Sequence, residues 1–127
     1  MNLAGFRAAV AQTLGTVAHV ADGTWALLPA PVDAVEPPAY VLVWGPDPML
    51  AIQTVCTDQA QLEVVAIAAR LEPQANYPVL EDMVDAAIAA LTPAGLRPWQ
   101  SLAPAPFQIA QLDYLASRIQ IRQPVTS

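Results

Sequence analysis

The chain has 127 residues, of which 55% are hydrophobic and 13% are charged, and its formal net charge is −6 at pH 7. This length predicts one domain spanning residues 1–127. No apolar run approaches the ~20 residues that a membrane helix requires, and the first ten residues lack the cationic start and apolar block of a signal peptide. The single cysteine, Cys56, cannot form an internal disulfide. We therefore expect a protein of the reducing cytoplasm.

The distribution of charge excludes one large class of function. All five basic residues are arginines, and none lies between Arg7 and Arg70, although six acidic residues do. Proteins that bind nucleic acids neutralise phosphates with clustered basic residues, and this chain has no such cluster. Because large exposed apolar patches are rare on monomers, the high apolar content favours assembly with other subunits.

The first half of the chain predicts one helix and two strands. Apolar residues at helical spacing predict a helix over residues 3–17, with Asn2 as its N-cap and Gly15 as a candidate end. Residues 24–28 (TWALL) are expected to form a short strand before a proline-rich link. Residues 40–44 (YVLVW) lie between two turn sequences and are typical of a buried strand.

The next segment is ambiguous. Residues 61–70 (QLEVVAIAAR) fit a helix or a strand, and three β-branched residues together with the lack of caps favour a strand. Residues 52–56 before them are a candidate start of the same hairpin arm.

A second helix is predicted over residues 78–91. Leu80, Val84, Ala87 and Leu91 form its apolar stripe, and Pro78 suits its first turn. Three acidic residues then lie in its first half, where a carboxylate gains roughly 0.3–1 kcal/mol from the positive helix end. They are Glu81, Asp82 and Asp85. We interpret them as a solvated helix face, because an acid–base pair also needs a cleft and unequal environments.

The C-terminal part predicts two further strands. Residues 96–102 are one, although Pro98 would confine it to an edge or a bulge, and Pro104 and Pro106 are then expected to break the chain. Residues 117–122 alternate and predict a half-exposed terminal strand that ends before Pro124. The sequence thus predicts an α+β domain with an antiparallel or mixed sheet of about four to five strands and two helices on one face.

The residue types needed for catalysis or cofactor binding do not come together in the sequence. His19, the only histidine, lies at the end of the first helix, and one histidine with one cysteine cannot build a zinc site. A nucleophilic pair of His19 and Cys56 is disfavoured because Cys56 lies in an apolar run. The absence of lysine and of a glycine-rich loop excludes Schiff-base and P-loop chemistry. We predict no catalytic, cofactor-binding or metal-binding residue, and we expect Trp25, Trp44 and Trp99 in the core.

The order of these features resembles the tail terminator proteins of long-tailed bacteriophages, especially those of actinobacterial hosts. The resemblance covers residues 6–125. It rests on the leading helix, the PPAYVLVWG strand, the acidic helix YPVLEDMVDAAIAAL, the APAPF turn and the final strand YLASRIQIRQPV. The family has no signature motif and is recognised by layout and length.

The resemblance implies an α+β subunit that closes into a homo-hexameric ring on the tail tube, stops tube growth and joins the tail to the head. The implied partners are further copies of the chain, the tail tube protein and the head–tail connector or head-closure protein. DNA would pass through the lumen without specific binding. The implied location is the virion neck, and the host cytoplasm during assembly.

Three cations are candidates for subunit contacts in such a ring: Arg70, Arg118 and Arg122. Guanidinium groups suit carboxylates across an interface, and a solvated strand face is the alternative. One departure is that MLAIQTVCTDQAQ is short for a loop that reaches into the ring. Two rival functions stay open, namely another neck component and a small monomeric ligand-binding or enzymatic domain.

Overall fold

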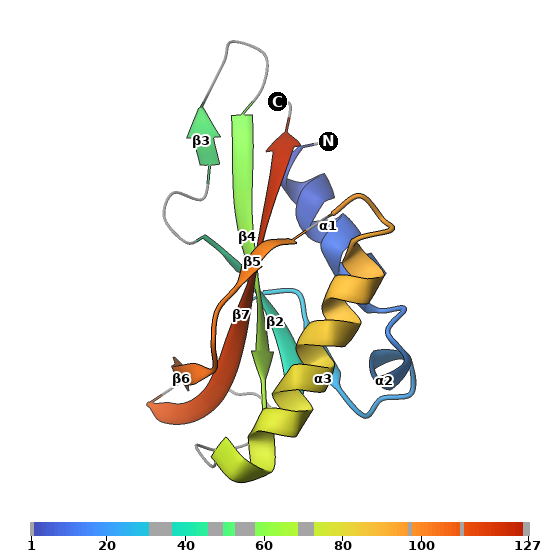
Figure 1. Cartoon of the computed structure of the whole chain (residues 1–127). Coiled ribbons are helices and arrows are strands. Elements are labelled where there is room, and N and C mark those ends of the chain that lie inside the picture. The colour runs from blue at the N-terminus through green and yellow to red at the C-terminus, as the bar shows by residue number, and fades with distance from the viewer. Residues whose placement is uncertain are drawn as a thin grey trace.

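The computed structural model describes residues 2–30, 37–45, 50–52, 58–68, 73–96, 98–109 and 111–125. These residues form three helices and seven strands (Figure 1), which confirms the predicted α+β class. Their bounds are α1 Leu3–Leu14, α2 Ala18–Ala21, β1 Ala26–Leu28, β2 Ala39–Trp44, β3 Leu50–Ile52, β4 Asp58–Ile67, α3 Pro73–Leu91, β5 Pro98–Ser101, β6 Ala105–Ile109 and β7 Leu112–Val125.

The strands form one mixed sheet in the order β1-β2-β4-β7-β5. Strand β1 pairs in parallel with β2, and the other described pairs are antiparallel. Strands β2 and β3 follow each other along one side of β4, and β5 and β6 do so along one side of β7. The sheet therefore has seven strands, which is more than the predicted four to five, because two of its five positions are each filled by two short strands.

The main core lies between the sheet and the helices α1 and α3, which cover one face (Figure 1). Alternate residues of β4 and β7 point toward the helices, and Leu62, Val64 and Ile119 among them are fully buried. Tyr40 on β2 joins the two layers, because its hydroxyl donates a hydrogen bond to the carbonyl oxygen of Met83 in α3 at 2.5 Å.

Helix α1 is shorter than predicted. Its N-cap is confirmed, since the Asn2 side chain accepts a hydrogen bond from the amide of Gly5 at 2.8 Å. The helix ends at Leu14, and Gly15 is its C-cap. Val17 has an extended backbone, with φ −60° and ψ 133°, and its buried side chain still reaches the core before α2 begins. The candidate end at Gly15 is therefore confirmed, whereas the apolar pattern up to residue 17 extends three residues beyond the helix.

Helix α3 begins five residues before the predicted start. Proline is favoured at the first helical position, and Pro73 occupies it, whereas Pro78 lies inside the helix. The first turn contains no acidic residue, so the predicted gain from the helix dipole, which falls off within one turn, does not apply to Glu81 or Asp85. Both side chains are exposed, as a solvated face requires.

The predicted break after β5 is confined to residues 102–104, which include Pro104 and form no strand, whereas Pro106 continues the sheet. Pro106 lies within β6 opposite Leu115 of β7. Strand β6 is on the outer side of β7, where the missing amide of a proline removes no ladder bond. Strand β7 is also longer than predicted and includes Pro124, which pairs with Gln59.

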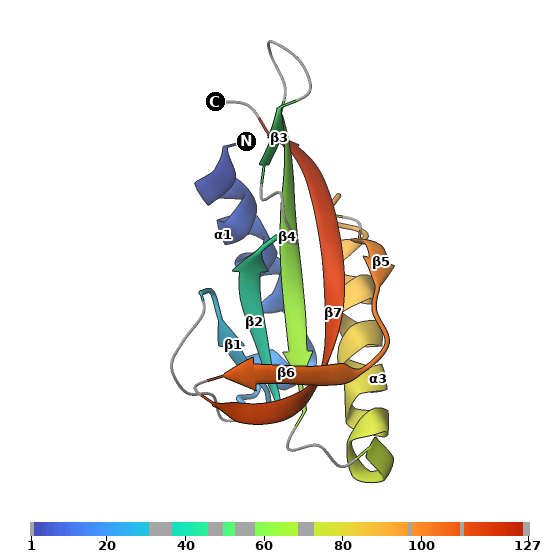
Figure 2. The same ribbon diagram turned by 90° about the vertical axis from the view of Figure 1, so that its left-hand side faces the viewer.

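Strand β7 is an interior strand rather than a half-exposed terminal one, because β4 lies on one side of it and β5 and β6 on the other. It curves at its start, so that β6 crosses the face of the sheet opposite the helices (Figure 2). A second buried cluster lies at this end, from Ala39, Val41, Val65, Ile67, Tyr114 and Ala116.

The ambiguous central segment is a strand, as predicted, and β4 begins three residues before the expected start. Of residues 52–56, only Ile52 is described, at the end of β3. Cys56 and Arg70 lie outside the described residues. Within the described part of the chain, no helix is both long enough and apolar enough to span a membrane.

Candidate interaction surface

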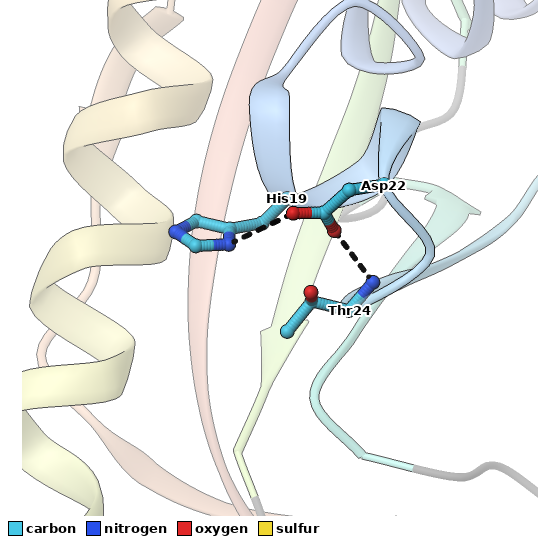
Figure 3. Close-up of polar contacts among 3 residues, drawn as sticks. All are labelled: His19, Asp22 and Thr24. Carbon is cyan, nitrogen blue, oxygen red and sulfur yellow. Dashed lines mark hydrogen bonds and ion pairs between the residues drawn. The ribbon is translucent and has the colours of Figure 1, made fainter.

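His19 is the second residue of the short helix α2, not the end of the first helix as predicted, and it lies beside Asp22 (Figure 3). Its Nδ1 atom lies 3.8 Å from Oδ2 of Asp22, and both side chains are more than half exposed. Asp22 also accepts a hydrogen bond from the amide of Thr24 at 2.8 Å, and the bonds from Thr24, aided by His19, lower the pKa of this carboxyl. The Asp22 carboxylate therefore stabilises the turn between α2 and β1. The described residues contain no group of three potential metal-ligating side chains.

The face of the sheet opposite α1 and α3, which we call the open face, carries most of the interior polar groups. Its middle is formed by Gln61 and Glu63 of β4, Gln120 of β7 and Gln100 of β5. Gln120 is 4% exposed and donates from Nε2 to Oε2 of Glu63 at 3.1 Å, and it accepts a bond from the side-chain amide of Gln100. These bonds satisfy the buried amide and hold three strands in register.

Arg122 and Trp99 form an exposed stack on the open face. The guanidinium carbon of Arg122 lies 3.7 Å from the centroid of the Trp99 ring, and Trp99 is 42% exposed. A bulge explains the position of this tryptophan. Pro98 pairs with Ile121 and Gln100 with Gln120, so Trp99 is the extra residue and shares the open face with Gln100. The prediction that Trp99 lies in the core is wrong, whereas Trp25 is buried and Trp44 partly so.

A second arginine stacks in the same way further along β7. The guanidinium carbon of Arg118 lies 5.4 Å from the centroid of the Phe107 ring of β6, within the range of a cation–π contact. Arg118 and Arg122 are four residues apart on one strand face, which places them about 13 Å from each other. The structure thus brings two of the three candidate cations onto one surface.

Neither arginine forms an ion pair with a carboxylate of the described part of the chain. The one ion pair found there is that of His19 with Asp22. Glu63 is the cross-strand neighbour of Gln120 and is therefore only diagonal to Arg118 and Arg122. A guanidinium held flat on an aromatic ring still presents its edge, which is the part that binds a carboxylate.

A cleft of about 360 Å³ lies between α3 and the segment that joins β5 to β6. Its lining comprises Leu80, Glu81, Val84, Asp85, Ser101, Leu102, Ala103, Pro104 and Ser117. Two carboxylates and two hydroxyls therefore converge on a partly apolar floor. Ser117 is 3% exposed as a residue, and its hydroxyl has no hydrogen bond to another described residue. No fully buried side-chain polar atom of the described residues lacks a partner, so this hydroxyl is open to the cleft that Ser117 lines.

Sequence reasoning found the arginines and missed what surrounds them. The alternation around Ile119 and Ile121 correctly placed Arg118 and Arg122 together on the opposite side of the strand. Pro98 was a usable signal for the bulge, but which side chain a bulge redirects depends on the pairing register. The cleft has no local signal, because it joins a helix to a segment about 20 residues further along the chain.

No protein-family model matches this chain, and no curated protein shows significant sequence similarity to it.

Proposed function

We propose that this protein is a structural subunit of a bacteriophage tail, a terminator that forms a ring on the tail tube, stops its growth and joins it to the head. The observation that carries the proposal is the open face, where Trp99 and Arg122 form an exposed stack beside a rigid polar network. Exposed aromatic and arginine side chains are enriched where proteins contact each other. The order of elements along the chain resembles that of tail terminators, and this resemblance is the reason for proposing a tail assembly in particular.

The size and charge of the chain agree with this role. A closed ring needs contacts between two different surfaces of each subunit, burying on the order of 800 Å² per partner. Further exposed apolar side chains are available for such contacts: Tyr77, Leu102 and Leu112. A net charge of −6 keeps the surface from binding phosphates, so DNA can pass through the ring without adhering to it.

Deletion of the gene tests the proposal directly. We expect lysates of the deleted phage to contain overlong tails, because a tube without its terminator keeps adding subunits, and expression of the chain in trans should restore the normal tail length. The measurement is the distribution of tail lengths by electron microscopy. Tails of normal length that fail to join heads would contradict the proposal and identify another neck component. Infectious particles of normal size would exclude both.

A further inference from the structure

We propose that the Trp99–Arg122 stack of one copy docks into the acidic cleft of a second copy, where Arg122 bridges the carboxylates of Glu81 and Asp85. This inference rests on the proposed ring and deepens it by naming the two surfaces that meet. The occupant of the cleft is thus a guanidinium group from the same protein.

Arg122 is prepared for such a contact in the isolated subunit. Its stacking on Trp99 fixes the plane of the guanidinium, and its Nε is oriented toward Oε1 of Gln61 at 3.5 Å. Little side-chain freedom remains to be lost when a carboxylate binds, which reduces the cost of association. The residue is exposed, so a partner can reach the free edge of its guanidinium.

The cleft has the complementary chemistry. Glu81 and Asp85 are four residues apart on α3 and both line it, so their β-carbons are about 5–6 Å apart, a spacing that lets two carboxylates share one guanidinium. The Ser117 hydroxyl, which is open to the cleft and has no hydrogen bond to another described residue, can accept a further N–H bond. Leu80 and Val84 supply an apolar wall for the arginine stem.

The two surfaces cannot meet within one copy. Strand β5 presents Trp99 on the open face, whereas Ser101 of the same strand lines the cleft on the helix side. The sheet therefore separates the arginine from its proposed socket. Two different surfaces on one subunit join copies head to tail, and such a contact closes into a ring when the rotation between neighbours permits it.

The chain offers two matched controls for charge. Asp82 is exposed beside Glu81 on α3 but does not line the cleft. Arg7 is an exposed arginine on α1, away from the open face. Substitutions at these two positions change the net charge by the same amount as substitutions at the proposed contact, so they separate a local effect from a general one.

The test measures self-association of the purified chain by sedimentation velocity, alone and with tail tubes. We expect Arg122→Glu and Glu81→Arg each to weaken association at least about tenfold, because each puts like charges in contact. Arg7→Glu and Asp82→Arg should leave it unchanged. Arg122→Gln, which removes the charge without reversing it, should give an intermediate loss, and it serves if the reversal variant does not fold by circular dichroism.

Complementation tests the pairing itself. The chain with both Arg122→Glu and Glu81→Arg should recover association, because the charges are exchanged across the same contact. Each single variant should stay dissociated alone, but an equimolar mixture of the two should recover association. The reversed stack of one variant then meets the reversed cleft of the other, and the unchanged stack and cleft form the second contact, so the two variants can alternate around a ring.

Two results would overturn the inference. If the wild type assembles and Arg122→Glu or Glu81→Arg assembles equally well, the contact is elsewhere and the ring proposal stands. If Asp82→Arg is as damaging as Glu81→Arg, the effect belongs to the general charge and not to the cleft. A wild type that remains monomeric at high concentration and on tubes would contradict both the contact and the ring, and tail lengths of the deleted phage then judge the terminator role separately.

Discussion

At the scale of single residues, Tyr40 makes stability depend on pH. It is fully buried, and burial raises the pKa of its hydroxyl well above the usual value near 10. The unfolded chain loses this proton above about pH 10, whereas the folded chain keeps it. The stabilising contribution is therefore complete below that pH and declines as the pH rises toward the folded-state pKa.

We expect the free energy of unfolding to fall by about 1.4 kcal/mol per pH unit above pH 10 on account of this one proton. Urea denaturation between pH 8 and pH 11, followed by circular dichroism, measures the slope. Tyr40→Phe is the control. It should cost about 1 kcal/mol at pH 8 through the lost bond to Met83 and should show a shallower decline. Equal slopes for the two proteins would mean that Tyr40 ionises normally.

Residue-scale predictions from the sequence succeeded where local chemistry decides. Asn2 caps α1 because its side chain bonds an amide three residues away, and a short-range rule captures that. Trp99 was misplaced because its environment is made by β7, about 20 residues later in the chain. Aromatic character alone does not say which face of a bulged strand a side chain takes.

At the scale of elements, the end of α3 depends on one glycine. Gly95 has φ +78°, and the amide of Leu96 next to it donates to the carbonyl of Leu91 at 3.1 Å, which closes the last turn. A β-carbon at Gly95 meets no atom within 4 Å, so the cost of a substitution there is one of backbone conformation.

Gly95→Ala should lower the free energy of unfolding by about 1–2 kcal/mol, because the left-handed conformation is unfavourable for a residue with a β-carbon. Gly95→Asn should lower it less, since asparagine tolerates this conformation. Midpoints of urea denaturation decide the order. Equal stability of Gly95→Ala and the wild type would show that the helix end rearranges without cost.

Element boundaries show where sequence rules compete. Pro73 and Pro78 both fit a helix start, and the rule that favours proline at the first position does not choose between them. Pro106 was expected to help break the chain between two strands, but an outer strand accepts it because a proline there has no ladder bond to lose.

At the scale of the whole molecule, we expect the proposed assembly to be sensitive to salt, because the proposed contact is between charged groups. The Debye length falls from about 10 Å at 0.1 M salt to about 3 Å at 1 M, so a contact between Arg122 and carboxylates should weaken. Sedimentation velocity of the wild type at the two concentrations should show dissociation at high salt. The self-association of Arg122→Gln should weaken less than that of the wild type between the same two salt concentrations. Stronger association at high salt would indicate a contact dominated by apolar surface.

The fold class was predictable at this scale, and the surface was not. Alternating and helical patterns identify α+β layers because each element needs one apolar face. The interior position of β7 did not follow from its pattern, since Ile119 and Ile121 show a buried side but not which strands flank it. The acidic cleft and the arginine stack arise from this pairing and could not be foreseen without it.

The prolines along the outer side of β7 limit how copies of this protein can adhere to one another. Pro98 and Pro106 stand on the two strands of that margin and have no amide hydrogen to offer an incoming chain. Edge-to-edge pairing of strands from different copies, which would build open-ended fibrils, is thereby hindered. Contacts between copies at this margin would then have to be made by side chains, which are specific for one partner surface and one orientation. A subunit that is proposed to stop the growth of the tail tube is thus hindered from forming fibrils of its own.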